Sequence, residues 1–129
     1  MNPYFVAAAV LAMVVGLVHS VLGEIMIFRR MRQGGLVPTN GGTMLRESNV
    51  RILWASWHLV TVMGCCIAAC LIWLSLPTSE LQSPVYLQQA IIIAMLVSAA
   101  LVAIGTKARH PGWVGLLGVA VLVWLGRGF

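Results

Sequence analysis

The reactive side chains in this sequence are few, and the most prominent are His19, His58 and Glu24. His19 lies in an uncharged apolar stretch from Pro3 to Gly23, and Glu24 follows it directly. His58 lies in a second apolar stretch that begins just after Arg51. An ionisable group inside a membrane segment is costly, so it marks a candidate functional site. Imidazole also titrates near neutral pH and is the commonest metal ligand.

Three kinds of ligand fit these residue types. A catalytic metal ion would be held by His19, His58 and His110, or by two of them with Glu24, which leaves one coordination position open. A b-type haem would take His19 and His58 as axial ligands from two facing helices. A quinone-like or lipid-like ligand, or a relayed proton, would use the two histidines together with Glu24 and Arg51. No metal-binding motif such as HExxH singles out one of these.

The same residues also have a purely structural explanation. A histidine in a membrane helix often only forms a hydrogen bond to a neighbouring helix, and His110 is placed to cap a helix that begins at Pro111. Cys65, Cys66 and Cys70 are an odd number of thiols in the middle of an apolar stretch. We therefore expect the cysteines to pack and not to form disulfides.

The composition shows what kind of element must position these residues. The chain has 129 residues, of which 60% are hydrophobic and 9% are charged. Soluble domains carry about 25% charged residues, so the composition excludes a soluble cytosolic enzyme, a disordered tail and a freestanding nucleic-acid-binding module. We predict an all-α integral membrane protein with a single domain, residues 1–129. The composition leaves open whether it is an enzyme.

Four apolar stretches predict four transmembrane helices, because about 20 apolar residues span a bilayer as a helix. The predicted helices cover about residues 3–33, 44–76, 84–105 and 111–127, with a glycine-rich loop over 34–43. Pro3, Pro84 and Pro111 suit first helical positions. Glu47 and Arg51 are spaced to form an i,i+4 ion pair. We expect the helices to pack as a compact antiparallel bundle.

The basic residues predict the orientation of the chain. Seven of the eight lie in the connections 24–51 and 107–109, and the positive-inside rule assigns that side to the cytoplasm. Both termini would then lie on the non-cytoplasmic side of a membrane, expected to be a bacterial inner membrane. The three histidines would all lie near the cytoplasmic leaflet.

The remaining expectations concern partners. The basic side chains near the predicted interface would bind anionic lipid headgroups, at about 1 kcal/mol each. They are Arg29, Arg30, Arg32, Lys107 and Arg109. A membrane position accounts for these charges without nucleic acid. Small residues at four-residue spacing, such as Ala12, Gly16 and Ser20, would allow close helix packing. They suit a homo-oligomer or a non-catalytic accessory subunit of a larger membrane complex, which is the alternative to a protein with its own binding site.

Overall fold

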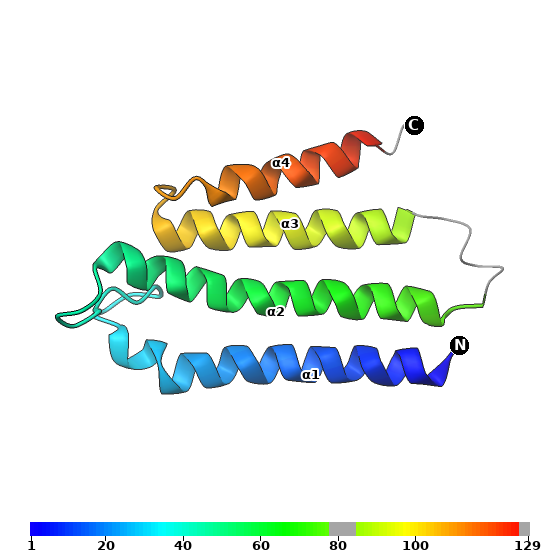
Figure 1. Cartoon of the computed structure of the whole chain (residues 1–129), viewed down its shortest axis with the longest axis horizontal. Coiled ribbons are helices and arrows are strands. Elements are labelled where there is room, and N and C mark those ends of the chain that lie inside the picture. Colours follow the sequence, from blue (N-terminus) through cyan, green and yellow to red (C-terminus); the bar gives the residue numbers. More distant parts are fainter. Residues whose placement is uncertain (78–84, 127–129) are drawn as a thin grey trace.

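The computed structural model describes residues 1–77 and 85–126, and within these ranges its elements are helices (Figure 1). Its elements are α1 (Pro3–Met26), the short 3₁₀ helix η1 (Phe28–Met31), α2 (Glu47–Ser75), α3 (Val85–Thr106) and α4 (Gly112–Leu125). Between η1 and α2, Gly41 and Leu45 form an isolated bridge. The prediction of an all-α protein with four helices is confirmed.

Three of the helices, α1, α2 and α3, are long and apolar enough to cross a membrane. α4 has 14 residues, which rise about 21 Å along a helix and fall short of the roughly 30 Å hydrocarbon core. The predicted first residue of the third helix, 84, and the predicted last residue of the fourth, 127, lie outside the described ranges. The structure is therefore compatible with a membrane protein that contains at least three spanning helices.

The helix boundaries follow the capping signals in part. α1 begins at Pro3, and the Asn2 side chain accepts a hydrogen bond of 3.0 Å from the Tyr4 N–H. However, α1 ends at Met26 and not near residue 33, and the chain turns into η1, which buries Phe28 against Trp54. α2 begins at Glu47 and not at 44, because the residues before it form the turn closed by Gly41 and Leu45.

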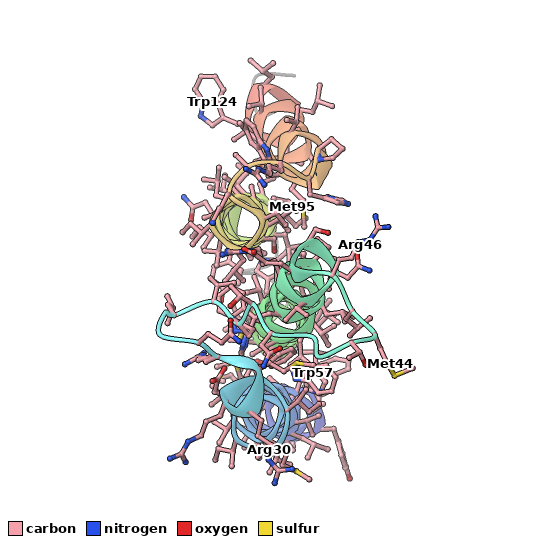
Figure 2. The ribbon with its side chains drawn as sticks, turned by 90° about the vertical axis from the view of Figure 1, so that its left-hand side faces the viewer. Arg30, Met44, Arg46, Trp57, Met95 and Trp124 are labelled. Carbon is pink, nitrogen blue, oxygen red and sulfur yellow. The ribbon has the colours of Figure 1, made fainter. Side chains whose placement is uncertain are left out.

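The four helices lie side by side in one row and in chain order, and consecutive helices run in opposite directions (Figure 1). Viewed along the helix axes, α1 and α4 lie at opposite edges of the row (Figure 2). The compact bundle expected from the sequence is therefore not confirmed, since the row is open. The buried core is correspondingly small and centres on Phe28, Trp54, Ala55 and Val102.

Glycines set the close contact between α1 and α2. The buried residues of α1 are Ala9, Gly16 and Gly23, seven positions apart, which keeps them on one face. A β-carbon at Gly16 would touch Thr61 at 3.5 Å, and one at Gly23 would overlap the indole nitrogen of Trp57. The Trp57 indole can lie against the backbone of α1 only because Gly23 has no side chain.

This contact generates a stability prediction. Gly23→Ala should lower the free energy of unfolding by about 1–3 kcal/mol, since the added methyl group forces the Trp57 indole to move. Gly115→Ala is the matched control, because nothing lies within 4 Å of a β-carbon at Gly115 in α4. It should be neutral or stabilising, because alanine has the higher helix propensity. Unfolding in detergent micelles measures both, and equal effects would contradict the account of this interface.

Candidate functional site

A chain of hydrogen bonds connects α1 to α2 on the loop side of their contact. The Thr61 hydroxyl donates to the Gly16 carbonyl oxygen at 2.8 Å. The Ser20 hydroxyl oxygen lies 2.7 Å from Thr61 Oγ1 and 2.8 Å from Nδ1 of His58. Each link joins one helix to the other, so the chain ties His58 to the backbone of α1.

The direction of every bond in this chain follows from the Gly16 carbonyl, which can only accept. Thr61 has one hydroxyl proton and gives it to Gly16, so Thr61 Oγ1 must accept the proton of Ser20. Ser20 has then used its own proton, so its oxygen must accept from an N–H at Nδ1 of His58. The neutral imidazole is thus held with its proton on Nδ1 and its lone pair on Nε2.

The Nε2 atom of His58 faces a carboxylate. It lies 3.9 Å from Oε2 of Glu24, while the other carboxylate oxygen of Glu24 accepts from Arg32 at 2.7 Å. The side chains are partly buried, with exposures of 19% for His58, 29% for Glu24 and 28% for Arg32. In the neutral form, a lone pair on Nε2 faces a negatively charged oxygen. A proton on Nε2 turns this repulsive arrangement into an ion pair.

Aromatic side chains surround the pair. The His19 ring stacks on the Trp57 indole, with centroids 4.4 Å apart and planes 7° apart. Trp54 approaches His58 edge-on at 5.0 Å, and Phe28 lies 6.1 Å from the same ring. These rings limit access of water to the imidazole, which strengthens the electrostatic interactions that it makes.

Several polar atoms of this cluster lack partners. In residues 1–77 and 85–126, four buried side-chain nitrogen or oxygen atoms have no hydrogen-bond partner: His19 Nε2, Arg32 Nε, Trp54 Nε1 and Ser98 Oγ. His19, Arg32 and Trp54 all belong to the cluster around His58 and Glu24. Buried polar groups are normally satisfied, so their concentration here distinguishes this region from the rest of the described chain.

The structure brings together some of the residues that were expected to form one site. His19, Glu24 and His58 lie in the α1–α2 cluster. Arg51 does not join them, because its guanidinium donates to Glu47 at 2.7 Å and to the Gly105 carbonyl at 3.2 Å. The predicted i,i+4 pair between Glu47 and Arg51 is therefore present.

His110 is also separate from the cluster. Its Nδ1 accepts from the Gly112 N–H at 3.1 Å, but α4 begins at Gly112 and its N-cap residue is Pro111, so the prediction that His110 caps a helix beginning at Pro111 is wrong. Within the described part of the chain, no group of three or more His, Cys, Asp or Glu side chains is placed to hold a metal ion. The expected three-histidine metal set is not assembled.

A haem does not fit between His19 and His58. Axial ligation requires the two imidazoles to face each other across a flat macrocycle, but the His19 ring is stacked on Trp57. The close contacts of Gly16 with Thr61 and of Gly23 with Trp57 leave no gap between the helices for such a group. The donor arrangement favours hydrogen bonding and proton binding over ligation.

Sequence reasoning did not assign Ser20 and Thr61 to the site, although they orient the imidazole, and it assigned Arg32 to lipid headgroups and not to Glu24. The signal was available in the spacing. Ser20 precedes Glu24 by four positions and Thr61 follows His58 by three, which places each pair on one helix face.

A second polar site lies at the same end of the molecule, between the start of α2 and the turn from α3 to α4. It is a cavity of about 520 Å³, hereafter the basic cavity. Its charged and titratable lining residues are Arg46, Glu47, Arg51, Lys107, Arg109 and His110. Glu47 is the one carboxylate among them, and it pairs with Arg51 at 2.7 Å and with Lys107 at 3.8 Å.

The turn that forms one wall of this cavity has an unusual backbone. The Lys107 N–H donates to the Ile104 carbonyl and the Ala108 N–H to the Ala103 carbonyl, the pattern of a Schellman motif. Glycine normally occupies the left-handed position, but here Lys107 has φ 53° and Ala108 has φ 56°. Each residue pays about 1–2 kcal/mol for this conformation, so the turn carries local strain.

The basic residues that were expected to bind lipid headgroups lie in three different environments. Lys107 and Arg109 line the basic cavity. Arg29 and Arg30 are exposed on η1, and Arg32 pairs with Glu24.

The three cysteines are free thiols on α2. Cys65 and Cys66 line an apolar groove of about 410 Å³ between α2 and α3. All three are partly buried.

We compared the chain with family models, curated proteins and solved structures, and none of them matches it. The functional conclusion therefore depends on the geometry of the two sites.

Proposed function

We propose that this integral membrane protein binds one exchangeable proton at the His58–Glu24 pair, near the cytoplasmic leaflet. The observation that carries the proposal is the hydrogen-bond chain from Gly16, which directs an Nδ1 proton toward Ser20 and leaves Nε2 of His58 facing Glu24 at 3.9 Å. Proton uptake at Nε2 pairs the imidazolium with the carboxylate, and proton release restores the neutral ring.

The chain of hydrogen bonds supports a site that stores a proton and not a path that conducts protons across the membrane. On the far side of Ser20 and Thr61 it ends at the Gly16 carbonyl oxygen, which accepts a hydrogen bond but has no proton to pass on. A proton would therefore arrive and leave on the side of Glu24 and Arg32. The change of one unit of charge occurs at a fixed place in the membrane.

Three ionisable groups surround His58, and they have different effects on its protonated form. Glu24 and His19 come from α1, and Arg32 follows η1. The Glu24 carboxylate stabilises the imidazolium, whereas the positive charge of Arg32 opposes it. When His58 is protonated, Glu24 is shared between two cations. The proton thereby changes how firmly Glu24 holds Arg32 and the segment between η1 and α2.

A hydrogen-bonding ligand of the quinone-like or lipid-like class is a second proposal for the same site. It is favoured by the buried, unpartnered Nε2 of His19 and Nε of Arg32. A carbonyl or hydroxyl group of the ligand could satisfy these atoms.

The signed effects of two substitutions test the proton site. Glu24→Gln should lower the pH at which His58 is half-protonated by about one unit, because the neighbouring negative charge is lost. Arg32→Gln should raise it, because a positive charge is lost. Histidine side-chain NMR of the ¹⁵N-labelled protein in micelles measures both, with His58→Gln to assign the signal and Arg30→Gln as an exposed control. Shifts of the same sign, or no shifts, would contradict the proposal.

We further propose that the end of the helices that carries η1 and the α3–α4 turn is cytoplasmic in a bacterial inner membrane, with both termini outside. The concentration of basic residues at this end supports this orientation. The alternative, an accessory subunit of a larger complex, would use the open edges of the row.

Labelling from one side of the membrane tests the orientation. With the native cysteines replaced, an impermeant maleimide added to intact bacterial cells should label Tyr4→Cys, an exposed position near the N-terminus. Gly35→Cys, where nothing lies within 4 Å of a β-carbon, should react only after the cells are permeabilised. The reverse pattern would overturn the orientation but not the clustering of the site.

A further inference from the structure

We propose that the basic cavity is a binding site for a phosphate group, either of an anionic lipid headgroup or of free phosphate. This inference concerns a site separate from the His58–Glu24 pair and does not depend on the proton proposal. The cavity, at about 520 Å³, falls in the size range of small-molecule pockets. It lies between the first turn of α2, the end of α3 and the start of α4.

The charges around the cavity are unbalanced. Arg46, Arg51, Lys107 and Arg109 contribute four positive charges, and Glu47 contributes one negative charge. Glu47 already pairs with Arg51 and Lys107. Arg46 and Arg109 form no ion pair with any residue that the structure describes. An anion bound in the cavity would relieve the repulsion among these cations.

The start of α2 adds further positive charge that an anion would neutralise. The N-cap position is held by Arg46, whose side chain makes no capping hydrogen bond. A cation at this end of a helix is unfavourable, because the helix dipole places partial positive charge there. The first-turn residues Ser48 and Asn49 line the cavity beside it. Figure 2 shows Arg46 beside the start of α2, apart from Arg30 on η1.

The strained turn supplies an independent argument. Lys107 occupies the position of the Schellman motif where glycine would fit without strain. It faces a cavity whose other cations come from α2 and from Arg109 in the same turn. Backbone strain of this kind is characteristic of functional sites. We therefore infer that lysine occupies this position for its charge and not for the stability of the turn.

The ligand class follows from the donors and the location. Guanidinium groups match phosphate oxygens in a bidentate geometry, and lysine adds a point charge. The cavity lies at the ends of two helices that are apolar enough to span a membrane, where lipid phosphates are found. A phosphodiester headgroup is thus the source that the position favours, and inorganic phosphate is the source that shares its chemistry.

The test uses the full-length protein in neutral detergent micelles. Phosphatidylglycerol should bind more tightly than phosphatidylcholine, as measured by native mass spectrometry and by the rise in thermal unfolding temperature. Lys107→Gly and Arg109→Gln should each weaken phosphatidylglycerol binding about fivefold, the equivalent of about 1 kcal/mol per charge. Lys107→Gly should also leave the unliganded protein equally or more stable, because it removes strain from the turn.

Arg30→Gln is the matched control, since it removes the same charge from exposed η1. It should change binding less than twofold. Competition by inorganic phosphate would identify the free anion as a ligand, and its absence would identify the lipid-attached group. Equal losses in Arg30→Gln and Arg109→Gln, or equal binding of the two lipids, would overturn the site.

Discussion

The close approach of α1 and α2 is the constraint on which the rest of this structure depends. Gly23 leaves bare backbone against which the Trp57 indole packs, and Gly16 lies in contact with Thr61. At this separation, the hydroxyl groups of Ser20 and Thr61 can reach across the interface, and a carbonyl oxygen of α1 becomes the final acceptor of the chain. A larger residue at Gly23 would overlap the Trp57 indole and force it to move.

The same contact orders the groups that titrate. His58 is oriented by Ser20 on one side of its ring, and its other nitrogen is thereby aimed at Glu24. Trp57 joins the helix contact to the site, because it packs on Gly23, donates to the His19 carbonyl at 3.0 Å and stacks on the His19 ring. Packing and proton chemistry are therefore properties of one interface. The basic cavity depends instead on α2, α3 and the strained turn, so the two sites can be perturbed separately.

Much of the local structure could be predicted from the sequence. The Asn2–Pro3 start of α1, the Glu47–Arg51 pair and the convergence of His19, Glu24 and His58 all follow from short-range spacing and helix depth. Depth along a helix does not say which neighbour a side chain faces. For that reason, Arg51 and His110 were expected at the histidine site, although they line the basic cavity.

The arrangement of the helices was less accessible to sequence reasoning. α1, α3 and α4 are apolar nearly all round, so no polar face marks which sides are exposed, and the pattern cannot distinguish a closed bundle from an open row. The early end of α1 at Met26 was also hidden. It depends on the burial of Phe28 against Trp54, a contact between residues distant in the sequence.

The most direct measurement is the tautomer of His58 in the neutral form, read from its two ¹⁵N side-chain shifts at alkaline pH. The hydrogen-bond chain requires the proton on Nδ1, with Nε2 unprotonated and facing Glu24. Ser20→Ala should abolish this preference, since it removes the acceptor of that proton. A neutral His58 with its proton on Nε2 in the unaltered protein would contradict the account.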